Sequence, residues 1–400
     1  MNKKIALLTL PLHTNYGGIV QCYALQTVLE RMGCEVSVLD RRFAGAQITL
    51  ALLLLRCMSV LKCAFRRYVL GQKHWVVMKP WAAVYEPDTR QASRLLCYRP
   101  VQAFVRERIH LTQPMHSSRE MQCWAMTHPV DAFVVGSDQV WRSQYAPSMT
   151  DCLLGFLPDD DPRLRVAYAA SFGSETSDIS TALLPRCAQL AQRFSAVSVR
   201  ERSGVRLARD LFGVEAHWAL DPTLLLSASD YQLDCPAPTQ EWQGVLTYIL
   251  DPTPQKSDLA ADVAHALGQS VHAITLTPRD AEGRSTAMLS VEEWLYAFRQ
   301  ARFVVTDSFH GCVFSIVHRK PFIAIANRER GLDRFTSLLD FLGLADRLLL
   351  TLDDYPQQRA SLLTPIDYAP VAARLSEARE ASMTFLRDAL GIGAQAVSVT

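Results

Sequence analysis

The fold is decided by one stretch, Phe303-Val304-Val305-Thr306-Asp307-Ser308-Phe309-His310-Gly311-Cys312-Val313-Phe314-Ser315-Ile316. The three apolar residues that open it are typical of a strand buried inside a parallel sheet. Residues 306–308 then carry short polar side chains of the kind that cap a helix. The apolar residues after position 312 return with helical spacing. The stretch therefore predicts a buried strand, a sharp turn and the start of a helix, with the next strand at 322–326.

The predicted turn also carries the first candidate functional residues. A strand-to-helix turn presents backbone N–H groups and the positive end of a helix at the carboxyl edge of a sheet, where open α/β sheets bind anions. His310 is the titratable ring on this turn, and Gly311 lets a ligand approach the backbone closely. A lone histidine at a helix start is more often structural than catalytic. The turn alone therefore predicts an anion-binding edge and leaves the function open.

Length and composition limit the class of protein. A chain of 400 residues predicts two or three domains. Hydrophobic residues make up 49% and charged residues 20%, as in a globular protein with a large core. The net charge of +1 gives no sign of a nucleic-acid surface. The cysteines form no C-x-x-C pair and no cluster with zinc spacing, which predicts separate thiols in a cytoplasmic protein and no metal site.

The apolar segment 48–61 raises the question of a membrane. It includes Leu52 to Leu55, and it is interrupted by Arg56 and followed by Lys62. Its uncharged part is shorter than the roughly 18 residues that a spanning helix needs. A buried or groove-covering helix is the favoured interpretation. The alternative is peripheral contact with the inner face of the membrane, since a basic, leucine-rich helix also has this pattern.

The chain opens with a strand, a glycine-bearing loop, a helix and a second strand. They are predicted at 4–10, 11–18, 19–32 and 35–39. The loop matches neither the dinucleotide fingerprint nor a P-loop. Its glycines, Gly17 and Gly18, predict either a resting place for an anion or polar ligand or a plain glycine turn.

The remaining pattern predicts an α/β protein with two Rossmann-like domains facing a cleft. Further strands end in polar residues at about 135, 171 and 199, and a second α/β unit begins at Val245. No internal sequence repeat is evident. The predicted parts are an N-terminal domain at 1–226 with a helical elaboration at about 47–127, a linker at 227–242, a C-terminal domain at 243–368, and a final segment at 369–400. This last segment is expected to form a helix that packs back on the N-terminal domain and ends in a loose tail.

Five short blocks, in order along the chain, resemble the polysaccharide pyruvyl transferase family. They are Asn15-Tyr16-Gly17-Gly18 with the following Gln21 and Tyr23-Ala24-Leu25-Gln26, Val135-Gly136-Ser137-Asp138-Gln139-Val140-Trp141, Val199-Arg200-Glu201 with Ser203-Gly204, Leu220-Asp221-Pro222-Thr223, and Asp307-Ser308-Phe309-His310-Gly311. The resemblance extends over about residues 4–326, except for the helical elaboration. It implies a fold like that of the GT-B glycosyltransferases. It also implies transfer of the pyruvyl group of phosphoenolpyruvate to two hydroxyls of one sugar, as a cyclic ketal.

The chemistry implied by the resemblance assigns roles to particular residues. Histidine can exchange a proton near neutral pH, so His310 is the expected acid–base group. A planar guanidinium suits phosphate and carboxylate, so Arg200 is the expected anion contact, with an ion pair to Glu201 as the alternative. The expected donor-binding residues are Ser308, Gly311, Arg202 and Asp307, and the expected acceptor-binding residues are Asn15, Tyr16, Gly17, Gly18, Ser137, Asp138 and Gln139.

The implied partners are phosphoenolpyruvate, as co-substrate, and a sugar, glycan or lipid-linked glycan acceptor. No cofactor is expected, because the reaction needs no metal in principle. The acidic run at 159–161 is interpreted as a solvated turn. Many family members carry a basic residue two positions before the histidine, and this chain has Ser308 there. That departure leaves one expected donor contact unassigned.

Two other functions fit the same pattern. A GT-B glycosyltransferase that uses a nucleotide sugar would have the same fold type, because fold does not fix chemistry. A family member that has lost donor contacts would bind a glycan without catalysis. The retained His310 favours an enzyme over this last alternative.

The segment 48–61 generates a test of membrane contact. If it lies on a membrane, vesicles that contain anionic lipid should carry the protein upward in a flotation gradient at low salt. Part of the protein should be lost at high salt, because the electrostatic share of binding is screened. Absence from the floating fraction at every salt concentration would favour the buried helix.

Overall fold

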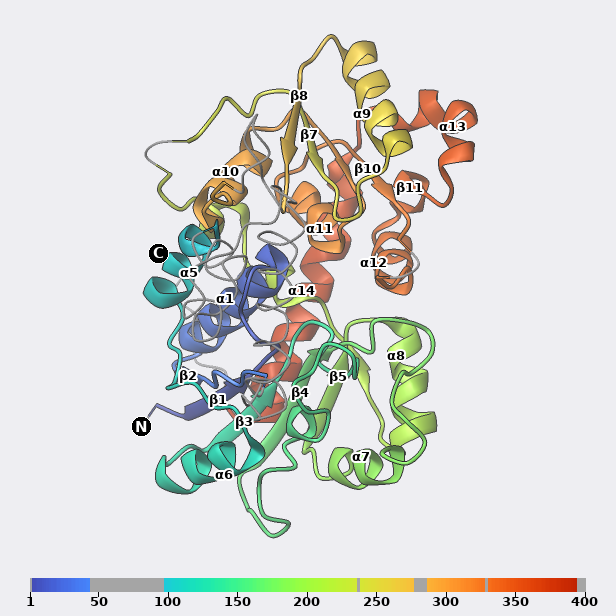
Figure 1. Cartoon of the computed structure of the whole chain (residues 1–400). Coiled ribbons are helices and arrows are strands. Elements are labelled where there is room, and N and C mark those ends of the chain that lie inside the picture. The colour runs from blue at the N-terminus through green and yellow to red at the C-terminus, as the bar shows by residue number, and fades with distance from the viewer. Residues whose placement is uncertain (1, 44–96, 236–237, 277–285, 328–329, 394–400) are drawn as a thin grey trace, which may run out of the picture. The chain divides into compact units, whose positions relative to one another are not determined.

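The computed structural model describes residues 2–43, 97–235, 238–276, 286–327 and 330–393 (Figure 1). The chain divides into two compact units. The larger unit comprises residues 1–43, 101–276 and 289–400, and it holds both sheets and the candidate site. The smaller unit comprises residues 44–100 and 277–288, where Met288 N–H donates a hydrogen bond to the Cys97 carbonyl at 2.9 Å. The apolar segment 48–61 lies outside the described residues.

The first sheet is built from six parallel strands. They are β1 (Lys4–Leu8), β2 (Glu35–Val38), β3 (Ala132–Val135), β4 (Leu164–Ala170), β5 (Ala196–Val199) and β6 (His217–Trp218). Their order across the sheet is β2-β1-β3-β4-β5-β6, and every pairing is parallel. All four residues of β3 are buried, because strands inside a parallel sheet are covered on both faces.

The second sheet has five parallel strands. They are β7 (Val245–Tyr248), β8 (Val271–Ile274), β9 (Phe303–Thr306), β10 (Phe322–Ile325) and β11 (Leu348–Leu349). Their order is β11-β10-β9-β7-β8. Numbered from β7 and read from the β8 edge, this is 2-1-3-4-5, which is also the order of the first five strands of the first sheet. The prediction of an α/β fold with two Rossmann-like parts is confirmed.

Helices connect the strands of both sheets. The α-helices are α1 (Tyr16–Arg31), α5 (Arg99–Arg108), α6 (Ser118–Thr127), α7 (Leu184–Ala191), α8 (Arg202–Leu207), α9 (Pro254–Leu267), α10 (Val291–Gln300), α11 (Phe309–Val317), α12 (Asp333–Leu342), α13 (Tyr355–Leu362) and α14 (Tyr368–Leu390). The short helices are η1 (Asp151–Leu153), η2 (Ala208–Phe212), η3 (Pro222–Leu224), η4 (Ala228–Tyr231), η5 (Ala345–Arg347) and η6 (Leu352–Asp354). Within the described ranges, no helix combines the length and the apolar character needed to cross a bilayer.

Several element boundaries differ from the sequence predictions. Helix α1 begins at Tyr16, so Gly17 and Gly18 lie in its first turn rather than in a loop. The predicted linker 227–242 contains η4, and its Trp242 is buried, with the indole N–H donating to Glu293 at 3.1 Å. Strands β6 and β11 are only two residues long, which is too short for periodicity to reveal them.

An aromatic cluster joins elements of the two sheets within the larger unit. The ring of Tyr16, from α1, stacks on Trp294 of α10, with centroids 5.4 Å apart and an interplanar angle of 7°. Trp294 also meets Tyr248 of β7 and Phe314 of α11 edge to face, at 5.5 and 4.9 Å. These large buried rings fix the start of α1 relative to α11.

Helix α14 contacts the first sheet and the turn between α11 and β10. Its Ser382 hydroxyl accepts a hydrogen bond from Leu220 N–H at 3.1 Å, and Phe385 packs against Tyr168 of β4. At its other end, the Tyr368 hydroxyl donates to the carbonyl of Lys320 at 2.6 Å. The helix therefore links the segment after β6 with the segment after α11.

Candidate functional site

The strand order of each sheet places the expected motifs at the same topological position. In open α/β sheets, ligands bind at the carboxyl ends of strands where the chain order reverses. The reversals here lie between β1 and β3 and between β7 and β9. The segment that contains Gly17 follows β1, the turn at 136–139 follows β3, and the turn at 307–308 follows β9.

His310 is held at the first turn of α11. The Ser308 hydroxyl caps this helix by accepting a hydrogen bond from Gly311 N–H at 3.3 Å. The imidazole is buried, and its Nδ1 lies so close to Gly17 that any side chain at position 17 would overlap the ring. The N-termini of α1 and α11 therefore meet at His310. Helix N-termini attract anions through their free N–H groups and dipoles.

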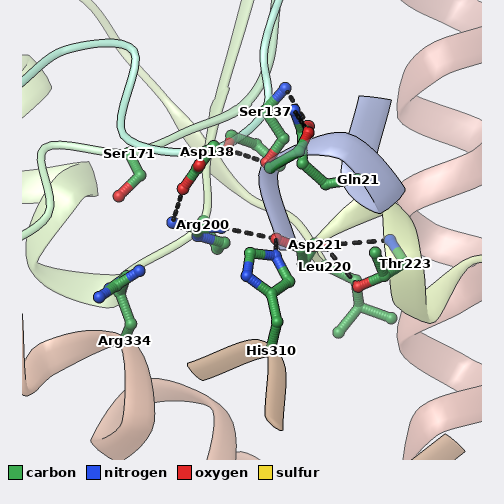
Figure 2. A network of polar contacts seen from close by, with 12 residues as sticks. Gln21, Ser137, Asp138, Ser171, Arg200, Leu220, Asp221, Thr223, His310 and Arg334 are labelled. Atoms are coloured by element: carbon green, nitrogen blue, oxygen red, sulfur yellow. Dashed lines mark hydrogen bonds and ion pairs between the residues drawn. The ribbon is translucent and has the colours of Figure 1, made fainter. Parts of the chain in front are cut away.

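The carboxylate of Asp221 connects His310 to Arg200 (Figure 2). Its Oδ2 accepts a hydrogen bond from Arg200 Nη1 at 2.6 Å and lies 3.6 Å from His310 Nε2, which is ion-pair range. Its Oδ1 accepts from the Thr223 N–H and hydroxyl at 3.0 and 2.6 Å, which starts η3. Burial alone raises the pKa of Asp221, but His310, Arg200 and Thr223 outweigh it and hold this pKa well below its usual range. Asp221 is therefore ionised.

Arg200, directly after β5, is shared among three carboxylates. Besides Asp221, its guanidinium lies 3.4 Å from Glu201 and 3.4 Å from Asp138. Burial lowers the pKa of Arg200, yet Asp221, Glu201 and Asp138 together raise it above its ordinary value. The ion pair with Glu201 is present, but it lies inside the protein and not on its surface.

Arg334 is a second buried guanidinium beside this network. It lies 5.4 Å from the centre of the Phe309 ring, and Arg200 lies 4.8 Å from the same centre. Arg334 donates to the backbone carbonyls of Gly331, at 3.4 Å, and Arg330. Burial, and then the charge of Arg200, lower the pKa of Arg334 to about 10. Among the described residues no carboxylate lies within ion-pair distance of it, so its charge is available to an anion.

Contacts between α8 and α12 position Arg334. The Ser203 hydroxyl donates to the Asp333 carboxylate, and Arg202 N–H donates to the Ser337 hydroxyl at 3.1 Å. Glu201 precedes α8 and accepts a hydrogen bond from the Ser171 hydroxyl. Burial raises the pKa of Glu201. The arginine-rich side of the site is therefore built from β5, α8 and α12.

The turn after β3 contributes one side chain to the ion network. Asp138 has a left-handed backbone, with φ 60°, and its carboxylate forms an ion pair with Arg200 and lies near Gly18. Ser137 donates its N–H to Gln21 at 2.9 Å and its hydroxyl to the Ala169 carbonyl at 2.8 Å. The Gln139 side-chain oxygen accepts from Arg142 at 2.9 Å. Ser137 and Gln139 thus hold the turn that presents Asp138.

Three of the expected site residues have other surroundings. Tyr16 is buried in the aromatic cluster, and its hydroxyl donates to the Leu289 carbonyl at 2.8 Å. Asp307 accepts from Leu250 N–H, Asp251 N–H and Lys256 Nζ at 2.6, 3.1 and 2.7 Å, so it ties β9 to the loop after β7. Arg202 is exposed at the start of α8. These residues hold the scaffold or lie on its surface. Asn15, also exposed, precedes α1 beside Gly18.

Two functional candidates were missed at the level of sequence. Asp221 stands in one of the five quoted blocks, directly before Pro222. Its place in that block could have identified it as a candidate site residue. Arg334 lies in an ordinary amphipathic helix, and only the fold brings it to Phe309.

The comparisons with known proteins identify the family. A family model described as polysaccharide pyruvyl transferase matches residues 15–329, well over half of the chain. The chain belongs to the polysaccharide pyruvyl transferase family, whose members are transferases. Among functionally curated proteins, no sequence matches it significantly.

Solved structures resemble the chain only distantly. MnaA of S. aureus, solved with UDP, is 10% identical, with a TM-score of 0.48 over 98% of each chain. UGT89C1 of Arabidopsis thaliana, with UDP-L-rhamnose, is 9% identical, with a TM-score of 0.47 over 98% of this chain and 99% of its own. An O-GlcNAc transferase mutant of Thermobaculum terrenum is 12% identical, with a TM-score of 0.45 over 98% of this chain and 69% of its own. Likeness at this level transfers neither activity nor substrate.

The shared carboxylate of Asp221 generates a prediction for stability. Asp221→Asn leaves the buried Arg200 without its shortest ion pair, which should cost about 3–5 kcal/mol of unfolding free energy at pH 7. Because the folded-state pKa of Asp221 lies below its unfolded value, the carboxylate stabilises the fold above that value and loses this contribution as pH falls. The gap between wild type and variant should therefore shrink below about pH 4. Urea unfolding of both proteins at several pH values measures this difference in unfolding free energy.

The matched control is Asp258→Asn, at an exposed position of α9. It should change the unfolding free energy little at any pH. Equal stability of Asp221→Asn and wild type at pH 7 would contradict the central role given to this carboxylate.

Proposed function

We propose that this enzyme transfers the enolpyruvyl group of phosphoenolpyruvate to two hydroxyls of one sugar, in a polysaccharide or its precursor, as a cyclic pyruvate ketal. Family membership supports pyruvyl transfer to a polysaccharide in general. One observation carries the finer proposal: His310 is buried where two helix N-termini meet, with Nε2 3.6 Å from an ionised Asp221. This arrangement supports a proton carrier beside the N–H groups of two helix N-termini, and the proposed reaction of an anionic donor needs both.

The reaction can be written with all atoms accounted for. Protonation of the methylene carbon of phosphoenolpyruvate makes the neighbouring carbon cation-like. One sugar hydroxyl adds to that carbon, phosphate leaves with the electron pair of its C–O bond, and the second hydroxyl closes the ring. One hydroxyl proton ends on the new methyl group and the other on phosphate. A single imidazole can serve both transfers, and the proposal assigns no cofactor.

Arg334 is proposed as the main cation for the donor. Phosphoenolpyruvate carries a phosphate and a carboxylate, whereas the whole chain has a net charge of only +1, so the positive charge has to be local. Arg334 is buried without a carboxylate partner among the described residues, and a bound anion would compensate that cost. Arg334 would also replace the basic residue that many family members carry at the position of Ser308. Backbone N–H groups near Gly311 and the Ser308 hydroxyl are proposed as further phosphate contacts.

Arg200 is proposed mainly as a positioning residue. Its charge is already balanced by Asp138, Glu201 and Asp221, so a donor would have to compete with those carboxylates. Through Asp221 it fixes the partner of His310. A direct donor contact of Arg200 and of Arg202 stays a prediction that binding data on the variants can decide.

The acceptor is proposed to lie at the loops of the first sheet. Asn15 and Asp138 place a side-chain amide and a carboxylate next to Gly18, and groups of this kind recognise sugar hydroxyls. The acceptor is a sugar, a glycan or a lipid-linked glycan. A cytoplasmic location belongs to this proposal. Contact of segment 48–61 with the inner membrane face stays the alternative to a buried helix, and the flotation test decides between them.

The first test concerns His310. His310→Ala should lower turnover by about 10²–10⁴, the usual contribution of a positioned acid–base group. Turnover is measured as the mass gained by a panel of glycan intermediates incubated with labelled phosphoenolpyruvate. His265→Ala, at an exposed position of α9, is the matched control and should be fully active. Near-normal turnover in folded His310→Ala would remove this residue from the mechanism. Transfer from a nucleotide sugar instead of phosphoenolpyruvate would favour a glycosyltransferase.

The second test concerns Arg334. Arg334→Met removes a charged set of hydrogen bonds and should weaken phosphoenolpyruvate binding by roughly 1.5–3 kcal/mol. Arg334→Lys keeps the charge but lacks the planar guanidinium. Its affinity for phosphoenolpyruvate should lie between those of wild type and Arg334→Met. Calorimetric titration of the folded proteins measures the affinities. Arg119→Met, on the exposed side of α6, should bind like wild type. Unchanged affinity in both Arg334 variants would place the donor elsewhere.

A further inference from the structure

A separate cavity lies at the other end of helix α11 from His310. Its volume is about 430 Å³, within the range of roughly 300–1,000 Å³ that is usual for small-molecule sites. Its walls come from the last turn of α10, the end of α11 with the following turn, the side of α14, and the segment at 227–228. His318 closes α11 eight residues after His310, so the two ends are about 12 Å apart along the helix.

The charged residues that line this cavity are all basic. They are Arg299, Arg319, Lys320 and Arg379, and His318 lies among them. No aspartate or glutamate belongs to the lining, and within the described part of the chain no carboxylate forms an ion pair with the four cations. Some other buried or half-buried arginines of the larger unit, for example Arg41 and Arg163, have carboxylate partners, whereas Arg334 has none among the described residues. The cavity is therefore a concentration of positive charge that the protein leaves unbalanced.

Local polar groups account for only part of this charge. Arg379 donates to the carbonyls of Leu224 and Leu226, and Arg299 lies over the ring of Tyr296 at 5.1 Å. The end of α11 is closed by backbone hydrogen bonds from His318 and Lys320. A helix C-terminus offers about half a negative charge, which is far less than four cations need.

The state of His318 also indicates that the positive charge of the cavity is unbalanced. Its Nε2 is buried and has no hydrogen-bond partner. Burial, followed by the charges of Lys320 and Arg299, lowers the pKa of His318 to about 4, so the ring is neutral at pH 7. Burial also lowers the pKa of Lys320. The neutral ring adds no charge of its own, so the positive charge of the cavity comes from the four cations.

The cavity also has an apolar wall. Ile316 and Val317 from α11, with Val371 and Leu375 from α14, also line it. A bare inorganic ion would leave this surface without contact. A ligand with one anionic group and an organic part would use both kinds of wall.

We propose that this cavity binds a phosphate ester, with its phosphate between Arg299, Lys320 and Arg379 and its organic part against Val371 and Leu375. A soluble sugar phosphate and a phospholipid headgroup share this chemistry. The site is distinct from the one at His310, and its occupancy does not depend on the reaction proposed above. His310 lies in the first turn of α11, and the cavity lies at the last turn of the same helix. A ligand in the cavity would therefore contact the helix that holds the proposed acid–base group.

The test uses two probes, glucose 1-phosphate and vesicles of phosphatidylcholine with phosphatidylglycerol. For the probe that binds wild type, Arg299→Gln with Lys320→Gln should weaken binding about 10- to 100-fold, since two charge-assisted contacts are lost. Arg106→Gln with Arg119→Gln removes the same charge from exposed positions of α5 and α6 and should have no such effect. Arg334→Met should also bind normally, which separates this cavity from the proposed donor site.

A second variant fills the cavity and keeps its charges. Ala372→Trp should block the probe that binds wild type, and a melting curve checks that the protein is folded. Loss of glucose 1-phosphate binding in both variants identifies a soluble ligand, and loss of vesicle binding in both identifies a lipid headgroup. If neither probe binds wild type, or if both variants bind as wild type does, the proposal is wrong. Vesicle binding that survives in both variants would come from another surface, such as segment 48–61.

Discussion

The candidate site depends on the charge of one carboxylate, that of Asp221. It is buried, so it is tolerated only because Arg200, Thr223 and His310 surround it. The same oxygen atoms start the short helix η3 and receive the guanidinium that follows β5. Fold and site therefore share a single interaction. A change that weakens this ion pair acts on the unfolding free energy and on the surroundings of His310 together.

The sequence carried much of the fold, because the signals were local. The strand, turn and helix at 303–316 were predicted from apolar runs and capping residues, and the structure has them as β9 and α11. The order of the strands could not be predicted from the sequence, because it depends on packing between segments that lie far apart in the chain. The two sheets share the order 2-1-3-4-5 although the sequence shows no repeat. Parallel strands need burial on both faces, and many different apolar residues satisfy that need.

The candidate site was predictable to the extent that its residues stand within a few positions of the end of a strand. His310, Arg200 and Asp138 all stand at strand exits, where a polar residue after an apolar run is a visible signal. Arg334 gave no such signal, because its meeting with Phe309 results from contacts of α12 with α8. Tyr16 and Asp307 show the converse. They stand inside the recognised blocks, yet their side chains pack and tie the scaffold. Proximity in sequence to a candidate site residue therefore did not predict where a side chain lies.

The contact between Gly17 and His310 turns a structural detail into a rule for comparing sequences. The ring occupies the space where any side chain at position 17 would begin. A relative that aligns over the whole chain but carries alanine or a larger residue there cannot hold its histidine in this pose. In such a relative, the histidine ring or the helix must lie elsewhere, or another residue must take the proposed role of the histidine. One letter in the first block therefore reports on the geometry of the last block, nearly three hundred residues away in the chain.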